Sequence, residues 1–181
     1  WNHLTTKDFV TYENRGPVLF PDSDLDSSGA YSGSAFVHDG KIHYFYTGNV
    51  KHFDRDDYDY VLTGREQNQI HVVAENPDEL GEKRIAVGPV DYPDDIGTHV
   101  RDPKILEHDG IYYMVLGART KDDRGCVLVY TSSNLEDWSY ATRIELGEKF
   151  GFMWECPDLF ELDGDLLLVC CPQGVSADGW R

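Results

Sequence analysis

The sequence has few cysteines and no long apolar run, and both deficits narrow its class. Four cysteines occur among 181 residues, and none belongs to a C-x-x-C pair. Neither a zinc site nor a disulfide framework is therefore indicated. No stretch reaches the roughly 18 apolar residues that a membrane span requires. We expect a cytoplasmic protein that binds no metal and has no membrane partner.

Basic residues are also scarce. The chain has 16 Lys and Arg residues against 33 Asp and Glu residues, which gives a formal net charge of -17. Such a charge would repel both the phosphate backbone of a nucleic acid and an anionic bilayer. Nucleic acid is therefore excluded as a partner. Because the acidic residues are scattered along the chain, an ordinary solvated surface explains them.

Helical periodicity is nearly absent, and a recurring hairpin pattern replaces it. No segment keeps a 3.6-residue apolar period for more than about two turns. Instead, Asp-Gly lies between β-rich runs in three segments, 36–46, 105–114 and 160–168. Asp-Gly suits a tight primed turn because both central residues of that turn take positive φ angles. Three such hairpins predict an all-β fold built from repeats.

The spacing of these hairpins favours a β-propeller over a sandwich. Successive Asp-Gly turns lie 70 and then 54 residues apart. This exceeds the roughly 40–45 residues of a WD40 repeat and implies long loops, such as 51–67. In a propeller, the innermost strand of every blade begins at the same end of the central channel. Since 181 residues are few for a complete propeller, we predict one domain over residues 1–181, an incomplete propeller of about three blades plus flanking strands.

A small polar cluster precedes each hairpin, at 31–34, 101–103 and 154–157. The propeller geometry predicts that the three clusters converge on one pocket. Asp102 and Glu155 would then occupy equivalent positions in successive repeats. A lone carboxylate beside proline is usually a turn or cap residue. Two carboxylates at one channel mouth, however, can supply the proton and the anionic support that glycosidic cleavage needs.

The neighbours of these two carboxylates predict different protonation states. Met153 and Trp154 precede Glu155, and an apolar setting favours the neutral carboxyl that a general acid requires. Arg101 precedes Asp102, and its positive charge favours the carboxylate form. The two side chains would therefore divide the acid and anion roles of a glycosidase site.

Three segments resemble the hallmark motifs of glycoside hydrolase family 32 and follow the order of that family. They are Tyr31-Ser32-Gly33-Ser34-Ala35-Phe36-Val37, His99-Val100-Arg101-Asp102-Pro103-Lys104 and Met153-Trp154-Glu155-Cys156-Pro157-Asp158-Leu159-Phe160. The family comprises invertases, inulinases, levanases and sucrose-6-phosphate hydrolases. The resemblance implies a five-bladed propeller that cleaves a fructosyl bond with retention of configuration. It also implies a small-molecule sugar as the partner, with no cofactor and no metal.

The resemblance further implies a role for each candidate residue. Glu155 would be the catalytic acid/base, and Asp102 would hold the fructose hydroxyls and stabilise the transition state. Arg101 would be a sugar contact or an electrostatic partner, and Ser34 and Trp154 would help to line the fructosyl subsite. Simpler roles remain open for the last two, since Ser34 could merely begin a strand and Trp154 could merely be a core side chain.

The nucleophile of the family has no match in the chain. It is an aspartate in a Trp-Met-Asn-Asp-Pro-Asn-Gly motif, which the sequence lacks, and the resemblance places it upstream of Trp1. The C-terminal β-sandwich of the family has no counterpart here either. We therefore expect the 181-residue chain to be inactive by itself.

Two alternatives and one refinement stay open. Family 43 arabinanases and xylosidases share the propeller but invert configuration, although the Glu-Cys-Pro and Ser-Gly-Ser segments speak against that family. A propeller that binds carbohydrate without cleaving it would explain the missing nucleophile. Within family 32, Tyr46-Thr47-Gly48-Asn49-Val50 resembles intracellular sucrose-6-phosphate hydrolases. A phosphate contact would then fall to Lys51, Arg55 or Arg65, although each alone is more often an ordinary surface charge.

Overall fold

The computed structural model describes residues 1–176, which form thirteen β-strands and one short 3₁₀ helix. The strands are β1 (Asn2–Thr6), β2 (Tyr12–Pro17), β3 (Ala30–His38), β4 (Lys41–Lys51), β5 (Arg65–Asn76), β6 (Glu79–Leu80), β7 (Arg84–Val87), β8 (Ile96–His108), β9 (Ile111–Thr120), β10 (Gly125–Ser132), β11 (Ser139–Ile144), β12 (Met153–Leu162) and β13 (Asp165–Gln173). The helix, η1 (Pro89–Asp91), lies between β7 and β8. No helix in this part of the chain is long and apolar enough to cross a membrane. The all-β prediction is confirmed.

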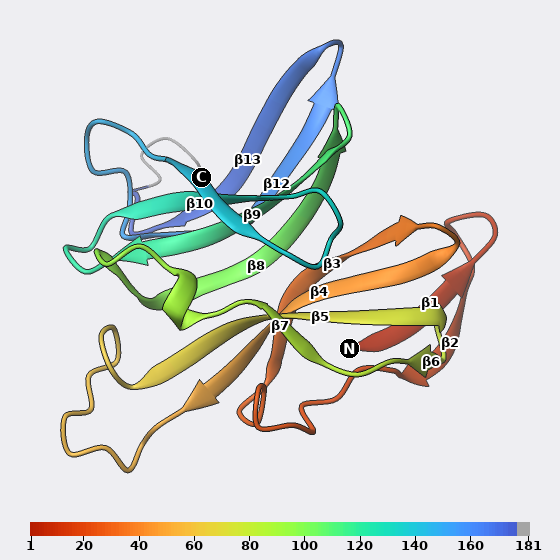
Figure 1. Ribbon diagram of the computed structural model, residues 1–181, viewed down its shortest axis with the longest axis horizontal. Coiled ribbons are helices and arrows are strands. Elements are labelled where there is room, and N and C mark those ends of the chain that lie inside the picture. Colours follow the sequence, from red (N-terminus) through yellow and green to blue (C-terminus); the bar gives the residue numbers. More distant parts are fainter. Residues whose placement is uncertain (177–181) are drawn as a thin grey trace.

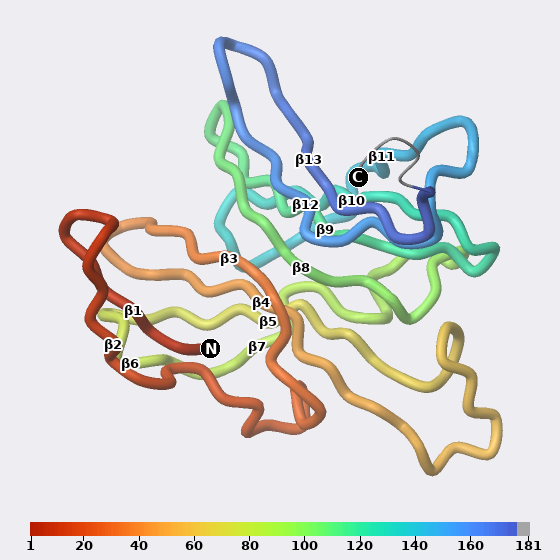
Figure 2. The backbone as a smooth tube through the Cα atoms, turned by 180° about the vertical axis from the view of Figure 1, so that it is seen from behind, coloured from red at the N-terminus to blue at the C-terminus, as the bar shows by residue number. Residues whose placement is uncertain are grey.

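The strands form four antiparallel sheets that fan out from a common centre (Figure 1). The sheets are β1-β2, then β3-β4-β5-β6 with β7 paired to β5, then β8-β9-β10-β11, and then β12-β13. Strands β3, β8 and β12 each lie at the edge of their sheet, and β8 contacts both β3 and β12. Figure 2 shows β8 between these two strands. The first strands of the three hairpins are therefore neighbours, while the number of blades in a complete propeller stays a prediction.

All three predicted Asp-Gly turns are confirmed. Asp39-Gly40 joins β3 to β4, Asp109-Gly110 joins β8 to β9, and Asp163-Gly164 joins β12 to β13. The φ angles are 48–54° at the aspartates and 74–87° at the glycines, as a primed turn requires. Because such a turn matches the right-handed twist of the strands, the local sequence determines where each hairpin reverses.

Alternate side chains of β9 pack against the two neighbouring sheets. Met114, Leu116 and Ala118 belong to one buried cluster, which also contains Phe45 of β4. Val115 belongs to another cluster, which reaches β12 and β13. Since side chains alternate between the faces of a strand, the sheet β8–β11 is covered on both sides. Full burial of an aliphatic side chain contributes about 1.5–3 kcal/mol, and this packing holds β8 in position between its neighbours.

Each of the strands β3, β8 and β12 is irregular at the level of its polar cluster. The register shifts lie between Ala30 and Gly33, between Arg101 and Lys104, and between Glu155 and Asp158. A β-bulge sets two residues opposite one and redirects a side chain. Bulges and edge strands also tolerate proline, which explains Pro103 and Pro157 inside strands. The polar clusters therefore lie within the bulged strands rather than before them.

A pair of buried histidines lies between β4 and β5. His43 Nδ1 and His71 Nε2 are 2.9 Å apart, and Phe45 stacks on the His71 ring with 4.3 Å between centroids. Burial lowers the pKa of His71 to about 4, and the charges of His43 and Arg84 act in the same direction. Burial also lowers the pKa of His43. Both rings are therefore neutral at neutral pH.

We expect the free energy of unfolding to fall as the pH is lowered from about 7 to about 5.5. His71 has a pKa of about 4 in the folded chain against a usual value of 6.5, so the unfolded state takes up the proton first. This linkage removes about 1 kcal/mol of stability over that range. Urea unfolding at both pH values measures the loss. The His71→Gln variant should lose less, and an equal loss in both proteins would contradict the prediction.

Candidate active site

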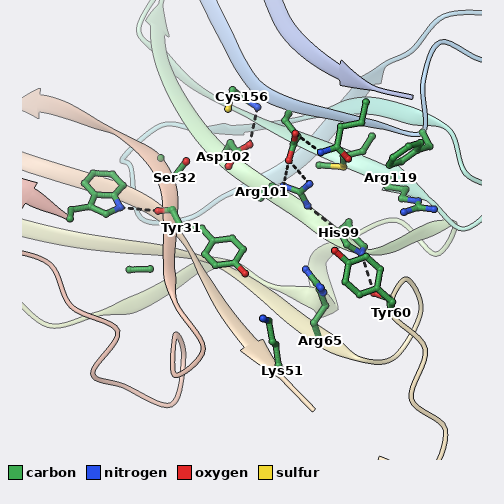
Figure 3. Close-up of a pocket in the computed structure, with 17 residues that line it drawn as sticks. Tyr31, Ser32, Lys51, Tyr60, Arg65, His99, Arg101, Asp102, Arg119 and Cys156 are labelled. Atoms are coloured by element: carbon green, nitrogen blue, oxygen red, sulfur yellow. Dashed lines mark hydrogen bonds and ion pairs between the residues drawn. The ribbon is translucent and has the colours of Figure 1, made fainter. Parts of the chain in front are cut away.

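Strands β3, β8 and β12 line one pocket of about 1100 Å³ (Figure 3). The polar and charged side chains around it are Tyr31, Ser32, Lys51, Tyr60, Arg65, His99, Arg101, Asp102, Arg119, Glu155, Cys156 and Gln173. The three polar clusters predicted from the sequence thus meet at one place. Among the described residues, Asp102 and Glu155 supply the carboxylates of this lining.

Two side chains fix the carboxylate of Glu155. Arg101 donates to Oε1 from Nη2 at 2.6 Å and from Nε at 3.1 Å. Gln173 of β13 donates to Oε2 from Nε2 at 2.6 Å. The Glu155 side chain keeps 28% of its surface exposed. Its surroundings are therefore polar, in contrast to the apolar setting expected from Met153 and Trp154.

Asp102 is held by the backbone and by a buried hydroxyl. Its Oδ2 accepts a hydrogen bond from the Cys156 N–H at 2.8 Å, and its own N–H donates to Thr47 Oγ1 at 3.0 Å. The residue is 7% exposed and has a φ of 64°, an uncommon backbone conformation for a residue other than glycine. The ion pair of Arg101 is with Glu155, which corrects the expectation that its charge supports Asp102.

The position of each carboxylate relative to its hairpin turn corrects the predicted equivalence. Asp102 and Cys156 each lie seven residues before the aspartate of their turn. Asp102 therefore corresponds to Cys156 in the next repeat, and Arg101 corresponds to Glu155. The bulges support this correspondence, because the register shift follows Arg101 in β8 and follows Glu155 in β12. The two carboxylates come from adjacent positions of the repeat rather than from the same position.

His99 extends the hydrogen-bond network of Glu155 beyond Arg101. Its Nε2 lies 3.0 Å from the carbonyl oxygen of Tyr60, and its Nδ1 lies 3.1 Å from Arg101 Nη1. The first contact requires a proton on Nε2, so Nδ1 accepts from the guanidinium. Burial, followed by the charge of Arg65, lowers the pKa of His99 to about 4. No pattern in the sequence indicates this role, because a lone histidine without metal-ligand spacing has many uses.

Two buried glutamines of β5 position the backbone of β8. Gln67 Oε1 accepts from the Val100 N–H at 2.9 Å, and Gln69 Nε2 donates to the Val100 carbonyl at 2.8 Å. Gln69 Oε1 also accepts from Thr47 Oγ1 at 2.8 Å, the hydroxyl that binds the Asp102 N–H. Residues two apart share one face of a strand. Two glutamines at that spacing in a β-rich segment indicate a polar strand face, a pattern that the sequence analysis did not use.

Ser34 and Trp154 lie outside the lining of this pocket. Ser34 Oγ donates to the Pro103 carbonyl at 2.8 Å. Trp154 is 5% exposed, packs in the cluster with Val115, and donates from Nε1 to the Phe150 carbonyl at 2.6 Å. The core role left open by the sequence describes Trp154, whereas Ser34 lies inside β3 (Ala30–His38) rather than at its start. Their neighbours in the chain, among them Ser32 and Met153, line the pocket instead.

Cys156 lines the pocket as a thiol. Desolvation of its sulfur, followed by the charge of Asp102, raises its pKa to about 11, although the residue as a whole is exposed. A cysteine acts as a nucleophile in the thiolate form, so Cys156 does not replace a catalytic carboxylate. Within residues 1–176, no group of three or more His, Cys, Asp or Glu side chains is arranged to hold a metal ion.

Two carboxylates at one polar pocket are the groups that glycoside hydrolases use to cleave a glycosidic bond. The family model described as "Glycosyl hydrolases family 32 N-terminal domain" matches residues 1–180. The chain therefore belongs to glycoside hydrolase family 32. This membership rules against the family 43 alternative.

Similar proteins in this family are named sucrose-6-phosphate hydrolase or β-fructofuranosidase. The chain is 37% identical over 186 residues to the sucrose-6-phosphate hydrolase of Bacillus subtilis (strain 168), and the match covers 100% of this chain and 36% of that protein. The solved sucrose-6-phosphate hydrolase from Lactobacillus gasseri matches with a TM-score of 0.85 and 34% identity over 98% of this chain and 35% of that one. A Bombyx mori family 32 β-fructofuranosidase in complex with sucrose matches with a TM-score of 0.78 and 28% identity, over 99% and 36% of the two chains. The chain thus spans about a third of the length of these relatives.

Proposed function

We propose that the complete polypeptide is a sucrose-6-phosphate hydrolase that cleaves the fructosyl bond with retention of configuration. The observation that carries the proposal is Glu155, which stands at the pocket with Asp102 and is oriented by Arg101 and Gln173. The names of the relatives support a fructoside substrate. A cytoplasmic location is part of the proposal, because the four cysteines are unpaired and such chains are typical of a reducing compartment.

In the first half-reaction, Glu155 transfers a proton to the glycosidic oxygen while a carboxylate nucleophile bonds to C2 of the fructosyl group. The bond from C2 to the leaving oxygen breaks. Asp102 accepts hydrogen bonds from the fructose hydroxyls, and its charge stabilises the positive charge that develops on the ring. Glu155 in its protonated form gives up its ion pair with Arg101, which frees the guanidinium to contact the sugar.

In the second half-reaction, Glu155 takes a proton from water, and the water oxygen displaces the nucleophile from C2. Arg101 and Gln173 hold the carboxylate in place for this step. The nucleophile must be a third carboxylate. Within residues 1–176, the pocket lining contains two carboxylates, and Cys156 is a protonated thiol. We propose that another segment of the polypeptide supplies the third.

Incubation of the complete polypeptide with sucrose in dilute methanol is expected to yield methyl β-D-fructofuranoside, because two successive displacements restore the starting configuration. Proton NMR of the product measures this outcome. The 181-residue chain alone is the control and should yield neither this product nor fructose. Formation of the α anomer, absence of turnover in the complete polypeptide, or hydrolysis by the chain alone would contradict the proposal.

A further inference from the structure

Two cations on the pocket wall have no acidic partner among residues 1–176, although the chain carries a net charge of -17. They are Arg65, the first residue of β5, and Lys51, the last residue of β4. The other two arginines of the lining are matched, since Arg101 pairs with Glu155 and Arg119 pairs with Asp123. The part of the pocket beside Arg65 and Lys51 therefore carries positive charge that no carboxylate of the described residues neutralises.

Arg65 is built into the wall rather than extended into solvent. It is 7% exposed, and its Cζ lies 4.3 Å from the centre of the Tyr60 ring. Its Nε is buried and has no hydrogen-bond partner within the described residues. A buried donor without an acceptor is costly. The planar fork of a guanidinium matches the oxygens of a phosphate, so the site has the shape and charge to receive such a group.

A series of contacts connects Arg65 to the proposed acid. Glu155 binds Arg101, Arg101 contacts His99, and His99 bonds to the carbonyl of Tyr60, whose ring stacks on Arg65. Figure 3 shows Arg101, His99, Tyr60 and Arg65 in this order, with Arg65 and Lys51 on the side away from Asp102 and Cys156. The acid must touch the leaving-group oxygen. Asp102 would hold the fructosyl group, so the leaving group must lie on the other side of Glu155. The pocket wall on that side is the one that leads to Arg65.

We infer that Arg65, assisted by Lys51, forms an anion subsite for a phosphate ester on the leaving-group hexose. This inference rests on the proposed function and names the residues that select a phosphorylated substrate. Arg55, the third cation considered from the sequence, does not line the pocket and forms two hydrogen bonds of 2.8 Å with Asp57. The phosphate oxygens would pair with the guanidinium of Arg65, which no carboxylate among residues 1–176 neutralises, whereas Arg101 and Arg119 are already paired.

The first test compares kcat/KM for sucrose 6-phosphate with kcat/KM for sucrose in the complete polypeptide. The Arg65→Gln variant is expected to lower the ratio of the two values about 10- to 100-fold, because a charge-assisted pair is lost. Lys51→Gln should lower the ratio less, since a lysine acts as a point charge. Arg55→Gln is the matched control and should leave the ratio unchanged. An unchanged ratio in Arg65→Gln would overturn the inference.

The second test measures binding without catalysis. Glucose 6-phosphate and glucose are titrated by calorimetry into the complete polypeptide and into its Arg65→Gln variant. The native protein should bind glucose 6-phosphate more tightly than glucose, and the variant should lose most of that preference. Equal binding of both ligands by the native protein would overturn the inference. A preference that depends on Arg65 in a protein without hydrolysis would uphold the anion subsite and reject the proposed function.

Discussion

Replacement of Glu155 by glutamine is expected to lower kcat on sucrose about 1000-fold, within the range that general acid–base catalysis contributes. Glutamine has the size of glutamate but has no acidic proton to give to the leaving oxygen. Its amide can still lie between Arg101 and Gln173, which now contact both carboxylate oxygens. KM should therefore change only a few-fold. Steady-state kinetics of the complete polypeptide and its Glu155→Gln variant provide the measurement.

A second substrate separates the acid role of Glu155 from a structural role. Fluoride leaves with little need of protonation, so fructosyl fluoride depends less on a general acid than sucrose does. The Glu155→Gln variant should lose much less of its initial fructosylation rate with the fluoride. A loss of the same size with both substrates indicates a damaged site, and retained activity on sucrose removes Glu155 from the mechanism.

The Asp102→Asn variant is expected to lower kcat/KM on sucrose about 100- to 1000-fold, as the removal of one electrostatic group from a transition state commonly does. Asparagine keeps a side-chain oxygen for the Cys156 N–H, which Asp102 now binds at 2.8 Å. Asparagine also tolerates the left-handed backbone that the φ of 64° requires. The substitution therefore removes charge while the bulge keeps its geometry. Steady-state kinetics of the Asp102→Asn variant of the complete polypeptide test the loss of activity, and its thermal melt tests whether the fold is kept.

Asp102→Val is the matched comparison for stability. A β-branched side chain is strained in the left-handed region, and the change leaves the Cys156 N–H without its acceptor. We expect a clear drop in Tm for Asp102→Val and little change for Asp102→Asn. If the asparagine variant melts as early as the valine variant, its loss of activity reflects folding. If it keeps full activity, the charge of Asp102 has no role in the reaction.

The sequence predicted those features that local chemistry determines. Asp-Gly requires a primed turn wherever two β-rich runs flank it, so all three hairpins were correctly placed. The convergence of the polar clusters followed from repetition of the same unit. Family motifs then gave Asp102 and Glu155, and the structure places both of these carboxylates at one pocket.

The contacts inside the pocket were not predictable from neighbours in the sequence. Arg101 precedes Asp102 in the chain, yet successive side chains of a strand point to opposite faces, and Arg101 reaches across to β12. The apolar residues before Glu155 suggested a dry setting. Trp154 instead points into the core, while Gln173 arrives from the partner strand. Pairings across sheets depend on packing over long sequence distances, which local patterns do not encode.

The bulges also explain why a pocket remains between strands β3, β8 and β12. Strands β3, β8 and β12 lie close together at the edges of their sheets, where unpaired backbone groups readily join a further strand. Pro103 and Pro157 have no N–H to donate, and the shifted register takes adjacent residues out of the ladder of hydrogen bonds. The three edges therefore cannot merge into one continuous sheet at this level. The interruption that positions Asp102 and Glu155 therefore also keeps the pocket between the three strands from being filled by backbone.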